Sequence, residues 1–176
     1  MRNPLENCSE DLRSLLLAAG WRPGVSRTKR AWWQFFAKTL DIKEFNRQYE
    51  KQFSQYPDHC ARRVVDELYG ILLETFQINR FYAIDFDPRI GMHCSDEIMR
   101  LGEILNECLV PIGETPSEAV ALLGATGNIY LMGVVASGVF SLGYFDDAIF
   151  AAITGQGWQL LEFDSETDPT GEFSLR

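Results

Sequence analysis

The spacing of apolar residues along the first 74 positions predicts three helices. Ser9 is a typical N-cap residue, and the two acidic residues after it lie in the first turn, where negative charge favours the helix dipole. Apolar residues then recur at helical spacing up to Gly20, a residue suited to the position just past a helix end. The same spacing returns twice further on. We therefore expect a second helix over residues 43–53 and a third that is capped by Asp58 and continues to about residue 74.

Beyond residue 74 the composition changes to one typical of strands. Residues 75–87 form a predicted strand that places Phe81, Ala83, Asp85 and Asp87 on one face. The other elements predicted from the pattern are a helix over residues 95–109, a turn over 111–116, a β-hairpin over 119–132 with its loop at 124–128, a strand over 134–140, a helix over 145–153 and a last strand over 158–163.

This mixture of helices and strands predicts a single α+β domain. The chain has 176 residues, 46% of them hydrophobic, which suits one globular unit and is too apolar for an intrinsically disordered chain. No linker long enough to separate two domains interrupts the pattern. Residues 1–163 are therefore expected to form the domain, and the polar residues 164–176 are expected to form a tail.

Charge changes the picture, because it is distributed unevenly. The net charge is −9, yet residues 1–63 carry 12 basic and 7 acidic side chains, whereas residues 64–176 carry 4 basic and 18 acidic ones. Phosphates need a positive surface, so this balance argues against nucleic acid as a partner of the acidic part. A protein with a basic surface fits better, since opposite potentials steer association, although surplus acid also serves solubility alone.

The sequence favours the cytoplasm as the location of the protein. No stretch approaches the roughly 18 uninterrupted apolar residues that a membrane helix needs, and the N-terminal residues lack the apolar core of a secretion signal. The four cysteines are scattered without regular spacing, as expected for reduced thiols. We expect no membrane association.

Few residues are candidates for chemistry, and each has a simpler explanation. Both histidines precede a cysteine, but adjacent side chains diverge and zinc sites usually space their ligands by two to four residues, so no metal is expected. Asp85 and Asp87 could act as paired carboxylates in a small hydrolase, although solvated acids at a strand end are the more economical interpretation. The glycines of residues 124–128 lack the P-loop lysine and suit a hairpin turn. No cofactor is expected.

A basic run at residues 27–30 precedes an aromatic-rich segment over residues 31–56. Basic side chains beside aromatic ones can bind single-stranded nucleic acid, but an isolated run followed by acidic sequence favours a solvated helix start. Within the segment, Phe45, Tyr49 and Phe53 recur every four residues, which is typical of core packing. The role of the whole segment is left open by the sequence.

Two parts of the chain resemble the third group of the SUKH superfamily of bacterial immunity proteins. The first is the stretch from Leu16 to Gly24, where a helix ends in a glycine followed by tryptophan. The second begins with residues 109–114, continues through the hairpin with residues 127–130 and finishes with residues 143–149 before Gly155. The order and spacing of these motifs agree over roughly residues 12–155.

The resemblance implies an α+β fold with a twisted, mainly antiparallel sheet flanked by helices. It also implies an immunity protein that binds and neutralises a cognate bacterial toxin, without catalytic residues or cofactor. An acidic surface suits a nuclease or another toxin acting on nucleic acid, because such a toxin has a basic substrate cleft. The candidate interface residues are Glu114, Asp146, Asp147, Asp85 and Asp87, in a protein expected to be a monomer or weak homodimer. A regulatory or scaffold module not tied to a toxin is the alternative.

Overall fold

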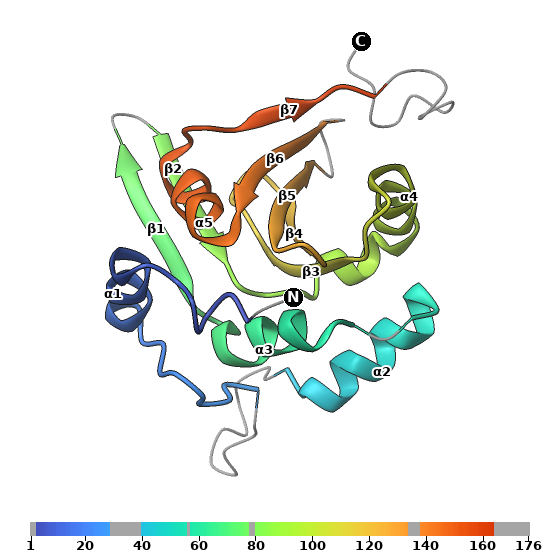
Figure 1. The fold of residues 1–176 in the computed structure, drawn as a ribbon, viewed down its shortest axis with the longest axis horizontal. Coiled ribbons are helices and arrows are strands. Elements are labelled where there is room, and N and C mark those ends of the chain that lie inside the picture. The colour runs from blue at the N-terminus through green and yellow to red at the C-terminus, as the bar shows by residue number, and fades with distance from the viewer. Residues whose placement is uncertain (1–2, 29–39, 56, 78–79, 134–137, 164–176) are drawn as a thin grey trace.

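The computed structural model describes residues 3–28, 40–55, 57–77, 80–133 and 138–163. They form five α-helices, a short 3₁₀ helix and one seven-stranded sheet. The strand order is β1-β2-β3-β4-β5-β6-β7, and each neighbouring pair is antiparallel. The sheet curls strongly around helix α5 (Figure 1). These features confirm the α+β fold with a twisted antiparallel sheet.

Among the described residues, three helices precede the sheet. Helix α1 (Glu10–Ala18) begins as predicted, since the Ser9 side chain accepts a hydrogen bond from the backbone of Leu12. Helix α2 (Ile42–Phe53) is capped by Asp41 and buries the stripe of Phe45, Tyr49 and Phe53, so that part of the aromatic segment is core. The predicted nucleic-acid alternative fell mainly on residues 29–39, which lie outside the described residues.

Helix α3 (His59–Leu68) is shorter than predicted. It ends at Leu68, and Gly70, with a φ of +69°, turns the chain into strand β1 (Leu72–Gln77). Strand β2 (Arg80–Asp85) pairs with β1 along its full length. The predicted cap at Asp58 is confirmed, but the predicted helix is wrong at its C-terminal end near residue 74, because apolar residues that continue a helical stripe are equally compatible with a half-buried strand.

A second boundary also differs from the prediction. After the 3₁₀ turn η1 (Gly91–His93), helix α4 (Ser95–Leu105) ends where Asn106 adopts a left-handed conformation with a φ of 51°. The next residues form strand β3 (Leu109–Glu114), although a turn was predicted over residues 111–116. Pro111 is accommodated because the pairing with β4 shifts register between Pro111 and Gly113.

The C-terminal part follows the prediction more closely. The hairpin consists of strands β4 (Ala119–Gly124) and β5 (Asn128–Gly133). Strand β6 (Val139–Tyr144) begins later than the strand predicted over residues 134–140, of which residues 134–137 lie outside the described part. Helix α5 (Phe145–Thr154) ends at Gly155, and strand β7 (Gln159–Leu161) completes the sheet. The predicted tail over residues 164–176 also lies outside the described residues.

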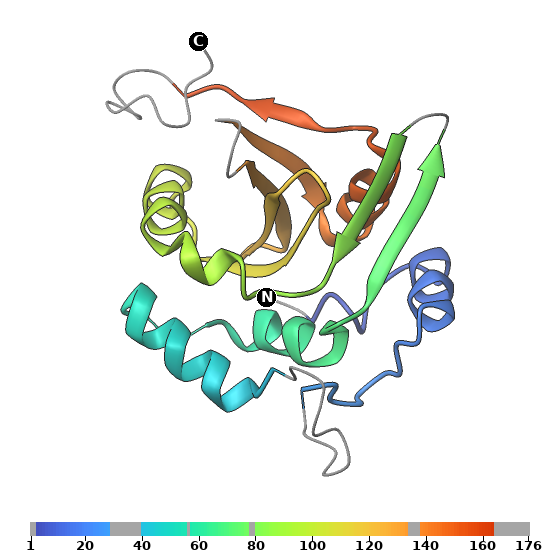
Figure 2. The ribbon, with the colours of Figure 1, turned by 180° about the vertical axis from the view of Figure 1, so that it is seen from behind.

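The core lies between the curled sheet and its helices. Helix α5 packs against β1, β2, β5 and β6, while α2, α3 and α4 cover the region around β3 (Figures 1 and 2). The largest side chains with almost no exposure include Trp21, Phe86 and Phe145. Among the described residues, no helix is both long enough and apolar enough to cross a lipid bilayer.

Candidate partner-binding face

Three of the five predicted interface residues meet where strands β2 and β3 join. Asp85 is the last residue of β2 and lies directly opposite Glu114, the last residue of β3. On its other side Asp85 lies opposite Leu72, the first residue of β1. Residues directly opposite each other in a sheet direct their side chains to the same face. Leu72, Asp85 and Glu114 therefore form a row across three strands.

Asp87 joins this row from the turn that follows β2. Its backbone N–H donates to the carbonyl of Asp85 at 2.8 Å, so the chain leaves the strand there. The prediction that Asp85 and Asp87 share one strand face is therefore wrong. Pro88 follows and carries no backbone N–H to continue the ladder. We call Asp85, Asp87 and Glu114 the acidic cluster.

Arg89 is a cation beside the acidic cluster that the sequence did not single out. Its guanidinium pairs with the Asp87 carboxylate, with Nε lying 2.8 Å from Oδ1, and it also lies over the ring of Tyr69. Asp87 is consequently held by the protein itself, with its side chain only 18% exposed. The sequence Asp87-Pro88-Arg89 was the available signal for this ion pair, because an Asp side chain in a turn can reach the residue two positions later.

The negative charges of the other two carboxylates, Asp85 and Glu114, are compensated less fully than the charge of Asp87. Burial raises the pKa of Asp85, and the charge of Asp87 raises it further against the opposing effect of Arg89. Burial also raises the pKa of Glu114, followed by the charges of Asp85 and Asp87. Both carboxyl groups therefore carry a charge that the folded protein disfavours, and a cation from outside would stabilise it.

The remaining two predicted residues lie elsewhere, at the start of α5. A carboxylate oxygen of Asp146 accepts a hydrogen bond from the backbone of Ser9 at 2.5 Å, which fastens the start of α1 to α5. Asp146 also adds to the raised pKa of Cys8, whose main cause is burial. Asp147 is exposed. The structure thus brings Asp85, Asp87 and Glu114 together, whereas it places Asp146 in a contact that joins two helices.

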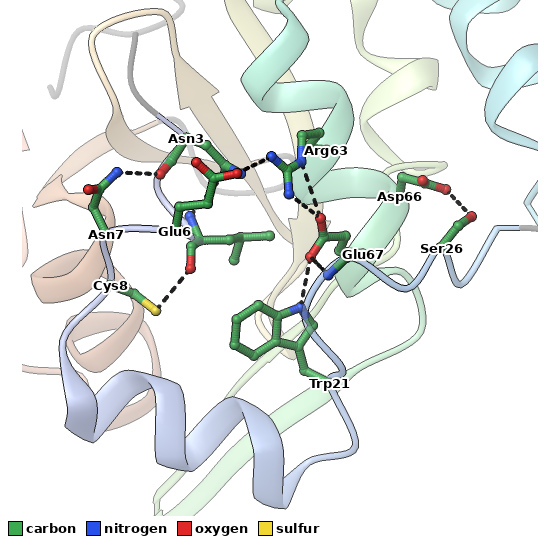
Figure 3. A network of polar contacts seen from close by, with 11 residues as sticks. Asn3, Glu6, Asn7, Cys8, Trp21, Ser26, Arg63, Asp66 and Glu67 are labelled. Carbon is green, nitrogen blue, oxygen red and sulfur yellow. Dashed lines mark hydrogen bonds and ion pairs between the residues drawn. The ribbon is translucent and has the colours of Figure 1, made fainter.

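A buried carboxylate holds the glycine–tryptophan turn in place. Glu67 of α3 is only 4% exposed and accepts hydrogen bonds from the Trp21 indole at 3.2 Å and the Gly24 backbone at 3.0 Å (Figure 3). Arg63, one turn earlier, donates to the other oxygen of Glu67 at 2.8 Å and also pairs with Glu6. The spacing of four residues between Arg63 and Glu67 was a signal for this pair, but not for its burial.

A second carboxylate fills the glycine-bearing hairpin loop. Glu107 accepts hydrogen bonds from the backbone and hydroxyl of Thr126, at 2.6 and 2.5 Å, and from the Tyr130 hydroxyl at 2.9 Å. A Cβ on Gly124 would lie 2.3 Å from a Glu107 oxygen, so glycine is needed for this close approach. The donors that a phosphate would require are therefore used by the protein's own side chain.

Two hollows in the described part of the surface lie away from the acidic cluster. One of about 390 Å³ is lined by residues of α2, α4 and β3, and another of about 390 Å³ lies beside α5. Neither is lined by Asp85 or Asp87, so their geometry does not favour the hydrolase alternative. Within the part of the chain that the structure describes, no group of three or more histidine, cysteine or acidic side chains is arranged to hold a metal ion.

Comparison with known proteins identifies the family. No curated protein and no solved structure matches the chain. The model of the SUKH-3 immunity protein family matches residues 8–155. The matched region begins just before α1 and ends at Gly155, so it contains the glycine–tryptophan turn, the acidic cluster and helix α5. The chain belongs to the SUKH-3 immunity protein family.

Proposed function

We propose that this protein binds and neutralises a cognate bacterial toxin that acts on nucleic acid, a nuclease above all, and that the acidic cluster contacts the toxin. Membership of an immunity protein family supplies the general role. The observation that carries the finer proposal is the pair of partly buried carboxylates, Asp85 and Glu114, which lie opposite each other and whose pKa values are raised by burial and by neighbouring negative charge. A nuclease cleft, lined with cations that normally contact phosphates, would relieve that repulsion.

Inhibition by this mechanism requires binding and no chemistry. Carboxylates in a basic cleft occupy the positions of substrate phosphates, and charge-assisted hydrogen bonds to Arg or Lys are the strong contacts of such an interface. Asp87 contributes by pairing with Arg89, which holds this guanidinium at the edge of the acidic cluster. We place the protein in the cytoplasm, where an incoming toxin of this class meets its nucleic-acid substrate, and we propose that it acts as a monomer or weak homodimer.

The test is co-expression with the product of the adjacent gene, scored by growth rescue and by co-purification. We expect the wild-type chain to rescue growth and the double variant Asp85→Lys, Glu114→Lys to lose rescue while keeping its circular dichroism spectrum. Glu162→Lys, which changes the same charge at an exposed position of the C-terminal strand region, is the matched control and should still rescue.

Two outcomes would contradict the proposal. If the product of the adjacent gene is harmless and does not bind, toxin neutralisation is contradicted and the regulatory or scaffold alternative is favoured. Full rescue by the double charge-reversal variant would instead leave the toxin in place and show that the contact lies away from the acidic cluster.

A further inference from the structure

Strand β1 forms a free edge of the sheet. It pairs with β2 on one side, and no strand of the described chain pairs with its other side. In both ribbon views β2 lies on the inner side of β1, and α1 lies outward of the lower half of β1, while the upper end of β1 extends beyond α1 (Figures 1 and 2). An edge strand presents a row of backbone N–H and C=O groups that can pair with another extended chain.

The side chains of this edge strand are unusually apolar for a surface. Phe76 is 74% exposed and Leu72 is 49% exposed, whereas Leu73, which points to the opposite face, is buried. Glu74 lies between the two exposed apolar residues and is itself exposed. We call Leu72, Glu74 and Phe76 the β1 edge. It presents the sequence apolar–acidic–apolar at alternate positions, all on one face of the strand.

The β1 edge is continuous with the acidic cluster. Leu72 lies opposite Asp85, and Asp85 lies opposite Glu114, so the exposed row along β1 meets the acidic row across the strands at Leu72. Glu74 thus lies between the two exposed apolar side chains, and Asp85 and Glu114 continue the row beside Leu72. An apolar strip with this border suits a partner that is itself apolar and basic at alternate positions.

We propose that the partner docks by adding an extended strand to β1, with a Lys or Arg opposite Glu74 and apolar residues opposite Leu72 and Phe76. Main-chain hydrogen bonds along the edge would supply affinity, and the alternate side chains would supply specificity. This inference rests on the proposed function for the identity of the partner as a basic toxin, and it adds how that partner is held.

Charge argues against a second copy of this chain as the occupant. If two β1 strands paired antiparallel so that both apolar residues were covered, Leu72 would lie opposite Phe76 of the other copy. Glu74 would then lie opposite Glu74 of that copy. Like charges directly opposite each other destabilise a strand pair, and a charged residue in the middle of an edge is a common protection against self-association.

A synthetic peptide tests the inference without the toxin. The probe is the capped, fluorescently labelled heptapeptide Thr-Val-Thr-Lys-Thr-Val-Thr, whose Val, Lys and Val lie on one face of a strand. We expect the wild-type protein to raise its anisotropy and to bind the matched peptide with Glu in place of Lys about tenfold more weakly. Methylation of alternate backbone nitrogens should abolish binding, because it removes the ladder donors.

A charge exchange provides the sharpest control. Glu74→Lys should reverse the preference so that the Glu peptide binds more tightly, while Phe76→Thr should weaken both peptides; Glu162→Lys should behave as the wild type. Absence of binding by the Lys peptide, or an unchanged preference in Glu74→Lys, would overturn the inference.

The cognate toxin separates failure of the inference from failure of the proposed function. Hydrogen exchange of the β1 amides should slow in the complex. If the toxin is neutralised while β1 exchange and the affinity of Phe76→Thr are unchanged, strand addition is wrong and the immunity function stands. If the peptides bind as expected but the chain rescues no toxin, the docking edge stands and the toxin is not its partner.

Discussion

Glu67 shows how one side chain can organise a turn that lies far from it in sequence. Its carboxylate receives donors from Trp21, Gly24 and Arg63, and it is almost completely buried. A buried carboxylate is stable only when such donors surround it. The Glu67 carboxylate therefore links the turn after α1 to helix α3, and the positions of both depend on its hydrogen bonds.

Replacement of Glu67 by Gln tests this link. The amide keeps one acceptor oxygen but turns an NH₂ group toward N–H donors, so at least one buried donor loses its partner. We expect the free energy of unfolding to fall by about 2 kcal/mol, measured by urea denaturation. The exposed Glu50→Gln on α2 is the control and should change little. Equal midpoints for the two variants would show that the network adds no net stability.

The acidic cluster predicts an opposite effect on stability. Because the pKa values of Asp85 and Glu114 are raised on folding, the native state binds protons that the unfolded state has already released. Stability therefore falls as the pH rises from the ordinary carboxyl range, roughly 4, through the raised values. Asp85→Asn and Glu114→Gln should increase the thermal midpoint at neutral pH, with the gain disappearing near pH 4, approximately.

Thermal unfolding across this pH range, monitored by circular dichroism, measures the effect. Glu162→Gln is the matched control, since it removes one carboxylate at an exposed position and should leave the profile unchanged. A lower midpoint at neutral pH in both cluster variants would mean that their charged forms are stabilised in the fold, contrary to the direction of the pKa shifts.

At the residue scale the sequence revealed part of this chemistry. The motif of a helix-ending glycine followed by Trp21 was recognised from the sequence, and in the fold the Trp21 side chain is buried while its backbone N–H donates to the Leu16 carbonyl of α1. Glu67 was not foreseen, since an acidic residue within an amphipathic pattern is normally solvated. Its burial depends on donors that come from a segment more than 40 positions away.

At the scale of elements, the two boundary errors have the same origin. Residues 68–73 and 105–110 are apolar enough to continue a helix or to enter a sheet, and local spacing does not separate these possibilities. Gly70 and Asn106 decide the outcome by adopting positive φ values. The β4–β5 hairpin and α5 were predicted correctly because their signals are local, a glycine-bearing loop between the strands and Gly155 at the end of the helix.

The junction of β2 and β3 depends on the absence of a side chain at Gly113. A Cβ there would lie 2.3 Å from the carbonyl oxygen of Asp85, far closer than a real contact permits. We expect Gly113→Ala to force the strands apart and to lower the unfolding free energy by about 2 kcal/mol in chemical denaturation. Gly138→Ala is the control, because its nearest contact would be an ordinary 3.6 Å. Equal stability of the two variants would contradict this account.

On the scale of the whole molecule, composition showed the excess of acid but not its arrangement. The surplus of acid lies after residue 63, in the two thirds of the chain that hold the acidic cluster. The sheet register places Asp85 opposite Glu114, whereas Asp146 accepts a hydrogen bond from the backbone of Ser9 and so links α1 to α5. Neither position follows from counting charges. Long-range strand pairing determines which carboxylates lie together. The five predicted interface residues could therefore not be grouped in space from the sequence alone.

Binding of a basic partner to the acidic cluster should release protons. A cation placed beside Asp85 and Glu114 favours their charged forms and lowers their raised pKa values. Affinity should therefore increase as the pH rises from the ordinary carboxyl range through the raised pKa values of Asp85 and Glu114, and level off above them. Titration calorimetry of the toxin complex, in two buffers of different ionisation enthalpy, measures the protons released. Fewer should be released by the Asp85→Asn, Glu114→Gln variant, and an identical release from both proteins would place the partner's cations elsewhere.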